Sequence, residues 1–166
     1  MLLNLVKAKS EEGKAQQFSV DFPLDADLVK DRGYDILSPV SVKGSFHYQN
    51  EELFLTATAK VTLLCVCDSC AEQFEKVFTF PVKEKFVEDY NVKDDEDYVI
   101  NHMTIDIEKP VIDNFFQTLP TKIKCKKDCK GLCSICGKNK NFYSCNCEEI
   151  ENEQQQLENP FVKLKK

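Results

Sequence analysis

Nine cysteines in 166 residues are the side chains of this sequence best suited to do chemistry. Six of them fall within 23 residues, between Cys125 and Cys147, and two more form a Cys67-x-x-Cys70 pair upstream. Two thiolates separated by two residues can bind one tetrahedral metal ion, because the turn between them brings both sulfurs together. A glycine directly after the second cysteine, as in Cys136-Gly137, relieves crowding beside the ligand. The pattern therefore predicts that these sulfurs bind zinc.

Counting the cysteines favours two four-sulfur zinc sites and one spare thiol. We predict that one site consists of Cys133, Cys136, Cys145 and Cys147. We predict that the other consists of Cys67, Cys70, Cys125 and Cys129, which would join the upstream pair to the cysteine-rich segment. Cys65 would be the spare, packed as a small apolar side chain. Two other arrangements stay open: one zinc ion held by some of the six C-terminal cysteines, or two ions bridged by all six.

The compartment expected from the sequence agrees with metal binding. Residues 1–19 hold five charged side chains and lack the apolar run of a signal peptide, and no stretch approaches about 18 consecutive apolar residues. We therefore expect a cytoplasmic protein with no membrane partner. In a reducing cytoplasm, clustered cysteines hold metal more often than they form disulfides.

Charge is distributed unevenly along the chain. The net charge of −6 argues against a protein that coats nucleic acid over its whole surface. Residues 84–113 hold ten acidic side chains and three lysines, whereas residues 121–147 hold seven lysines and one acid. We take Lys126, Lys127, Lys130, Lys138 and Lys140 as candidates for contact with RNA or a partner protein. The simpler alternative is that these lysines neutralise the thiolates and keep the segment soluble.

The elements that must position the cysteines indicate an α+β protein. We expect an antiparallel β-rich body, built from hairpins or a partly open barrel, with one main helix and a C-terminal cysteine-rich zinc module. Alternating polarity predicts strands over residues 40–48, 53–63 and 74–82, a hairpin turn at 49–52, and shorter strands near 2–6 and 18–22. Apolar residues at helical spacing predict a helix over about 106–119, with Asp106 as N-cap and Pro120 after its end.

These elements suggest a division of the chain into three parts. The body with its closing helix would occupy residues 1–120, and the zinc-binding module residues 121–148. Residues 149–166 would be a polar, flexible tail with a short, basic and amphipathic end.

Two enzymatic alternatives are weaker. A thiol oxidoreductase or redox sensor could use Cys67 and Cys70, but a reactive thiol needs a lowered pKa, and the intervening Asp68 is expected to raise it. Zinc-dependent hydrolysis needs an open coordination position and a general base. The two histidines, His47 and His102, lie far from the cysteine pairs in the sequence. We therefore expect a non-enzymatic binding module without a small-molecule substrate.

The motifs together resemble a known family. The sequence has Cys67-x-x-Cys70, a helix ending at Leu119-Pro120, the run Cys125-x-x-x-Cys129-Lys-Gly-Leu-Cys133-x-x-Cys136-Gly137-x-Asn139-x-Asn141, then Cys145-x-Cys147 and a closing Asn159-Pro160-Phe161. This pattern, over roughly residues 40–166, resembles the bacterial YceD family. Ser69 departs from it, because the family usually has a basic residue there.

The resemblance implies a ribosome biogenesis factor that supports accumulation of large-subunit ribosomal RNA. Its partners would be pre-ribosomal RNA or a ribosomal protein. Neither implication follows from the spacing or composition of the residues themselves.

Overall fold

The computed structural model describes residues 1–92 and 97–147 of this chain, and these form two compact units. The sheet unit comprises Met1–Cys65 and Glu75–Thr121, and the cysteine unit comprises Val66–Phe74 and the described residues from Lys122 to Cys147. The tail expected over residues 149–166 lies outside the described residues. Among the described residues, every helix is too short or too polar to cross a membrane.

The sheet unit is built on a six-stranded sheet in which β2, β4, β5, β6 and β7 are neighbours in that order and β3 also pairs with β5. The strands are β2 (Gln16–Phe22), β3 (Asp35–Ile36), β4 (Val40–Gln49), β5 (Glu52–Val66), β6 (Gln73–Glu88) and β7 (Tyr98–Ile100). The β2–β4, β3–β5 and β4–β5 pairs are antiparallel, and β7 runs parallel to β6. The predicted α+β body of mostly antiparallel strands is therefore confirmed.

Smaller elements complete the sheet unit. A second, two-stranded sheet pairs β1 (Leu2–Asn4) with β8 (Thr104–Asp106). The helices are α1 (Val6–Ser10), α2 (Asp27–Lys30) and α3 (Glu108–Thr118), with the 3-10 turn η1 (Asp89–Asn91). The sequence did not predict α1 or α2, because four or five residues are too few to show helical periodicity.

The central strands follow the alternation seen in the sequence. On β5, every second residue is buried, and on β6 the inward residues Phe78, Phe80, Val82 and Phe86 continue the same face. The outward positions of β5 include Thr56, Thr58 and Lys60. One face of the sheet therefore forms the apolar core, and the other is polar.

The hairpin between β4 and β5 closes with two residues. Gln49 pairs with Glu52, and the turn residues Asn50 and Glu51 both have positive φ, 52° and 62°. Two consecutive residues of positive φ are the geometry of a type I′ turn, whose twist suits adjacent antiparallel strands. The hairpin predicted at residues 49–52 is confirmed.

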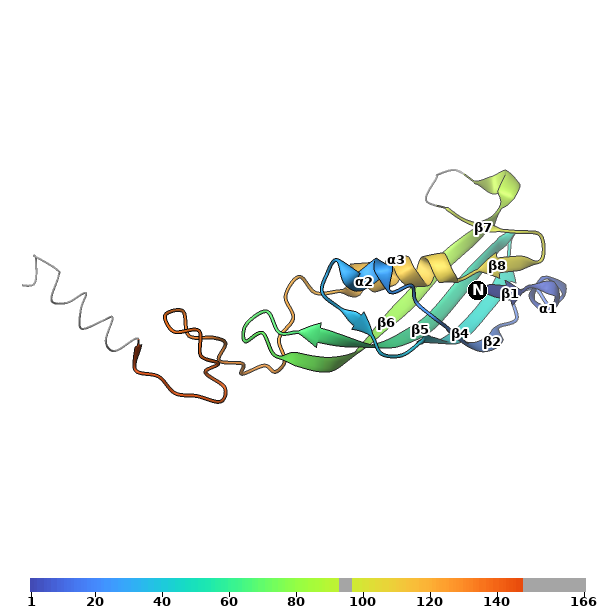
Figure 1. Ribbon diagram of the computed structural model, residues 1–166. Coiled ribbons are helices and arrows are strands. Elements are labelled where there is room, and N and C mark those ends of the chain that lie inside the picture. Colours follow the sequence, from blue (N-terminus) through green and yellow to red (C-terminus); the bar gives the residue numbers. More distant parts are fainter. Residues whose placement is uncertain (93–96, 148–166) are drawn as a thin grey trace, which may run out of the picture. The chain divides into compact units, whose positions relative to one another are not determined.

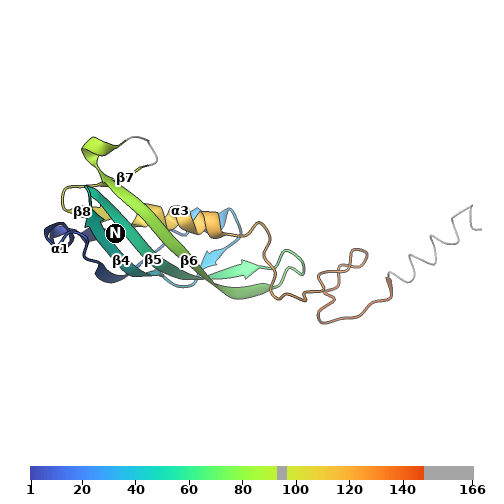
Figure 2. The same cartoon turned by 180° about the vertical axis from the view of Figure 1, so that it is seen from behind.

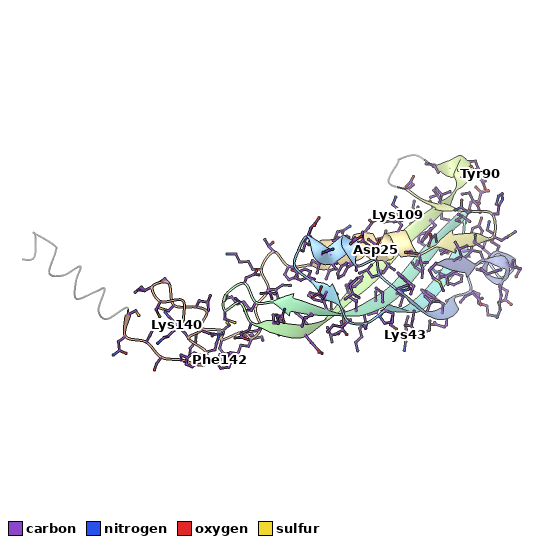
Figure 3. All side chains as sticks on the ribbon, viewed as in Figure 1. Asp25, Lys43, Tyr90, Lys109, Lys140 and Phe142 are labelled. Atoms are coloured by element: carbon purple, nitrogen blue, oxygen red, sulfur yellow. The ribbon has the colours of Figure 1, made fainter. Side chains whose placement is uncertain are left out.

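Helix α3 covers the apolar face of the sheet (Figures 1 and 2). The stripe expected from the sequence is buried at Ile107, Val111 and Phe115, and the Phe115 ring lies 5.7 Å from that of Phe80. Lys43, on β4, lies on the opposite side of the sheet from α3 (Figure 3). The prediction of Asp106 as N-cap is wrong, because the helix is preceded by Ile107. The Asp106 carboxylate instead accepts a hydrogen bond from the Glu108 N–H at 3.0 Å.

The pairing of Gly44 with Ala57 leaves no space for a larger residue. A Cβ atom on Gly44 would lie 2.3 Å from the Thr56 carbonyl oxygen and 2.5 Å from the Ala57 Cα, both of them backbone atoms. We predict that Gly44→Ala lowers the free energy of unfolding by about 2–3 kcal/mol, because the strands must separate locally. Urea denaturation measures the change. Ser45→Ala on the same strand is the control and should change stability by about 0.5 kcal/mol or less; equal effects of the two substitutions would contradict the close approach.

Candidate metal centres in the cysteine unit

The first group of cysteines joins two distant parts of the chain. Cys67 and Cys70 lie in the turn between β5 and β6, and Cys125 and Cys129 lie after α3. The Cys67 Sγ is 3.8 Å from the Cys129 Sγ, and the Cys70 Sγ is 3.7 Å from the Cys125 Sγ. All four sulfurs lie within 4.8 Å of one another. The four residues expected to form the upstream site therefore come together in space.

The second group consists of Cys133, Cys136, Cys145 and Cys147, whose sulfurs also lie within 4.8 Å of one another. Four of the six C-terminal cysteines therefore form this group, and the other two, Cys125 and Cys129, belong to the first group. This arrangement differs from the alternative in which all six would bridge two ions. Cys65 belongs to neither group and is fully buried in the sheet unit. Burial raises the pKa of its thiol, which keeps it protonated.

The two Cys-x-x-Cys turns have the same backbone geometry. The N–H of Gly137 donates to the Cys133 carbonyl at 2.9 Å, and the N–H of Ala71 donates to the Cys67 carbonyl at 2.9 Å. Gly137 and Ala71, each directly after the second cysteine, both have positive φ, at 70° and 59°. The sequence indicated this turn only at Cys136-Gly137, where a glycine follows the second cysteine. Alanine occupies the same strained conformation in the upstream turn.

Main-chain hydrogen bonds hold the upstream turn against the later segment. The Asp68 N–H donates to the Ile123 carbonyl at 2.9 Å, and the Ile123 N–H donates back to the Asp68 carboxylate. The Leu132 N–H donates to the Ser69 carbonyl at 2.9 Å. Among the described residues of the cysteine unit, Ile123 is the one large aliphatic side chain that is buried. These hydrogen bonds position the two cysteine pairs of the first group without the help of a metal ion.

Two asparagines connect the first group to the hairpin that carries the second. The Asn141 side-chain amide lies 3.4 Å from the Cys129 Sγ, and its oxygen accepts the Lys130 N–H at 3.0 Å. Asn139 bridges to Leu132 across the hairpin, and its side-chain oxygen accepts from the Asn141 amide at 2.8 Å. Both asparagines occur in the sequence motif, although the sequence alone did not assign them a role.

The thiols of the first group have widely separated pKa values. Burial alone would raise the pKa of Cys67, but backbone N–H groups of Cys125, Ser69 and Cys70 lower it to about 6. Burial and the neighbouring sulfurs of Cys70, Cys129 and Cys67 raise the pKa of Cys125 to about 12. The Asn141 amide and the Gly131 N–H lower the pKa of Cys129. Hydrogen-bond donors thus stabilise some thiolates, while crowding keeps another thiol protonated.

The thiols of the second group also have widely separated pKa values. Backbone N–H groups of Cys136 and Ile135 lower the pKa of Cys133 to about 6. The Cys136 sulfur raises the pKa of Cys147 to about 12, and burial adds to this effect. Four thiolates at these separations repel one another, so complete deprotonation of either group requires a cation.

The donor set and spacing fit a tetrahedral metal ion. Four sulfurs placed about 2.3 Å from a central ion at tetrahedral corners lie about 3.8 Å apart. The two separations of 3.8 and 3.7 Å in the first group match this value. Four sulfur donors in a tetrahedron are typical of zinc or iron. The structure therefore supports two groups of cysteines that could each hold a metal ion.

The candidate contact lysines lie around these groups. Lys126, Lys127, Lys130 and Lys138 are exposed, and Lys140 is half-buried. The described part of the cysteine unit holds seven lysines against the acids Asp68, Glu72 and Asp128, a net side-chain charge of +4. The structure also brings Phe142 and Tyr143 to this surface, two exposed aromatic residues that sequence reasoning missed. The sequence signal that could have revealed them is two consecutive aromatic residues in a lysine-rich segment.

Within the described part of the chain, the residues considered for thiol chemistry and for zinc-dependent hydrolysis do not form the sites that these two activities need. Asp68 was expected to raise the pKa of its neighbouring thiols, but its carboxylate accepts the Ile123 N–H. Against the effect of burial, backbone N–H groups lower the pKa of Cys67. The Glu72 backbone lowers the pKa of Cys70, but burial and the sulfurs of Cys67 and Cys129 outweigh this effect, so that the pKa is raised. The Cys67 side chain is buried among the sulfurs of its group. His47 and His102 belong to the sheet unit, where the His47 ring stacks on Phe54. The described residues therefore place no histidine in either group of four cysteines.

Comparison with known proteins identifies one family. The model of the family described as large ribosomal RNA subunit accumulation protein YceD matches residues 55–166, which include every cysteine of both groups. No curated protein and no solved structure matches the chain.

The hydrogen bond between Asp68 and Ile123 can be tested separately from the sulfurs. We predict that Asp68→Ala speeds amide hydrogen exchange at Ile123 by about tenfold, because the buried N–H loses an acceptor worth about 1–2 kcal/mol. Asp68→Asn is the matched control, since its amide oxygen can still accept. Equal exchange rates at Ile123 in the two variants would show that the side chain does not hold this segment.

Proposed function

Because this chain belongs to the YceD family of large ribosomal RNA subunit accumulation proteins, we propose that it is a non-enzymatic ribosome biogenesis factor whose cysteine unit is a zinc-stabilised module that contacts pre-ribosomal RNA. The observation that carries the proposal is the pair of four-cysteine groups within the region matched by the family. The lysines around the groups supply the chemistry for contact with phosphates.

Zinc is the metal that best fits a structural role here. Zinc has no redox chemistry and binds four thiolates in a closed tetrahedron. Four sulfurs fill every position of such an ion, which leaves no open position for a water molecule or a substrate. When bound, zinc would supply the positive charge that the clustered thiolates need. A closed site of this kind favours a binding role over a hydrolytic one.

Exposure of the lysines supports contact with RNA. Cys67, Cys70 and Cys133 are buried, whereas Lys126, Lys127 and the other exposed lysines reach solvent around them. Two zinc ions with four thiolates each would carry about −2 apiece and would offset the net side-chain charge of +4. We therefore expect a small number of local phosphate contacts and a modest dependence of RNA affinity on salt.

We predict two zinc ions per chain, and Cys67→Ser with Cys70→Ser should reduce this number to one. The same reduction is expected for Cys133→Ser with Cys136→Ser, because each double substitution removes half of the ligands of one group. Inductively coupled plasma mass spectrometry measures zinc and iron together. Cys65→Ser is the control and should keep two ions. An unchanged zinc content in the Cys67 and Cys70 variant would rule out the first site, and stoichiometric iron would rule out zinc as the native metal.

Replacing four exposed lysines should weaken RNA contact in cells. We predict that glutamine at Lys126, Lys127, Lys130 and Lys138 lowers ultraviolet crosslinking to large-subunit ribosomal RNA precursors by about tenfold, because phosphate contacts are lost. The matched control changes four exposed lysines of the sheet unit, Lys7, Lys14, Lys30 and Lys83, to glutamine and so alters net charge equally. Recovery of neither ribosomal RNA nor ribosomal proteins with the unaltered protein would eliminate the proposal. Recovery of ribosomal proteins alone would replace RNA with protein as the partner.

A further inference from the structure

A cavity of about 470 Å³ lies within the cysteine unit, beside the segment that follows its hairpin. The residues that line it include Lys130, Lys140, Phe142, Tyr143 and Ser144. Lys140 and Phe142 come from this same short segment (Figure 3). The cavity is open to solvent, and its volume is within the range of about 300–1,000 Å³ typical of small-ligand sites.

The aromatic side chains of this cavity are strongly exposed. Phe142 is 68% exposed and Tyr143 is 64% exposed, which makes them, with Tyr90 of the sheet unit, the most exposed aromatic residues described. Two adjacent rings that remain in water do not stabilise the fold by burial. Their exposure is explained if a flat ligand covers them.

Both ends of the aromatic segment are fixed by the cysteine groups. On one side, the Asn141 amide contacts the Cys129 sulfur of the first group. On the other side, Cys145 is a member of the second group. Between them, the N–H groups of Phe142 and Tyr143 both donate to the Asn139 carbonyl, at 3.1 and 3.0 Å. The backbone that carries the rings is therefore ordered, so little backbone entropy is lost when a ligand covers them.

We propose that this cavity binds an unpaired base of single-stranded RNA, with Phe142 and Tyr143 stacking on the base and Lys130 and Lys140 contacting flanking phosphates. This inference rests on the proposed function and names the form of RNA that the cysteine unit recognises. Stacking requires the face of a base, which duplex RNA keeps inside its helix.

The charge around the cavity favours RNA over an apolar peptide. Two lysines line it, and none of the described residues that line it is acidic. Lysines beside exposed aromatic rings are the combination used by proteins that bind single strands, where rings contact bases and cations contact the backbone. Because the two four-thiolate zinc centres, at about −2 each, would offset the net side-chain charge of +4, stacking must supply a large share of the affinity.

The test measures binding of the zinc-loaded full chain to fluorescein-labelled single-stranded and duplex RNA of one sequence. We expect Phe142→Ala with Tyr143→Ala to weaken single-strand binding by about tenfold or more, with an unchanged slope of affinity against salt concentration. The matched control, Phe142→Tyr with Tyr143→Phe, keeps both rings and should bind as the unaltered protein does. All variants should hold two zinc ions, and duplex RNA should bind more weakly and show no loss in the alanine variant.

Mass spectrometry of crosslinks to 4-thiouridine RNA should place adducts on Phe142 or Tyr143. One outcome would overturn the base-stacking site and leave the proposed function intact: the alanine variant keeps its affinity for single-stranded RNA, while the variant with glutamine at Lys126, Lys127, Lys130 and Lys138 loses it. Crosslinking of cells that recovers no ribosomal RNA would instead remove the proposed function. If crosslinking of the alanine variant in cells recovers RNA as before but no longer recovers a ribosomal protein, the inference is overturned in favour of a peptide ligand.

Discussion

Repulsion among clustered thiolates is the constraint on which the cysteine unit depends. Four sulfurs within 4.8 Å of one another cannot all be ionised without a compensating charge. The pKa of Cys67 is lowered to about 6 while that of Cys125 is raised to about 12, so one thiol of the set ionises readily and another resists. A bound cation removes this conflict. The same cation then joins the turn between β5 and β6 to the segment after α3.

The cysteine unit buries few side chains, so a bound cation would add to a small number of stabilising contacts. Among its described residues, the buried side chains are Ile123 and the cysteines Cys67, Cys70 and Cys133. Its order comes from turns, from hydrogen bonds such as that between Leu132 and Ser69, and from the asparagines beside the sulfurs. Small units without an adequate apolar core usually rely on metal or disulfides for stability. The sheet unit, with its continuous apolar face on β5 and β6, has no such need.

Sequence reasoning succeeded where a short-range pattern carries the information. Alternation along β4, β5 and β6 and the apolar stripe of α3 each follow from local periodicity. The two groups of four cysteines were suggested by their number, because nine cysteines allow two such groups and one spare. Sequence reasoning failed at α1, which is too short to show a period, and at Asp106, which precedes the N-cap residue Ile107 by one position. It also missed Ala71, because a positive φ at alanine leaves no mark in the sequence. The contacts of Asp68 and Asn141 depend on residues that are 55 and 12 positions away, which no local pattern shows.

The balance of charge explains why the exposed rings matter. With two zinc ions bound, thiolates and metal together would offset the net side-chain charge of +4 of this unit. The negative charge would be concentrated at the sulfurs, while lysines such as Lys126 and Lys130 extend into solvent. At physiological salt, charges act over about 8 Å, so each lysine attracts a nearby phosphate without creating a strong field over the whole unit. Under the proposed function, such a surface would bind the RNA backbone only weakly. Selectivity for one form of RNA would then have to come from uncharged contacts, and Phe142 and Tyr143 are the exposed aromatic side chains beside these lysines.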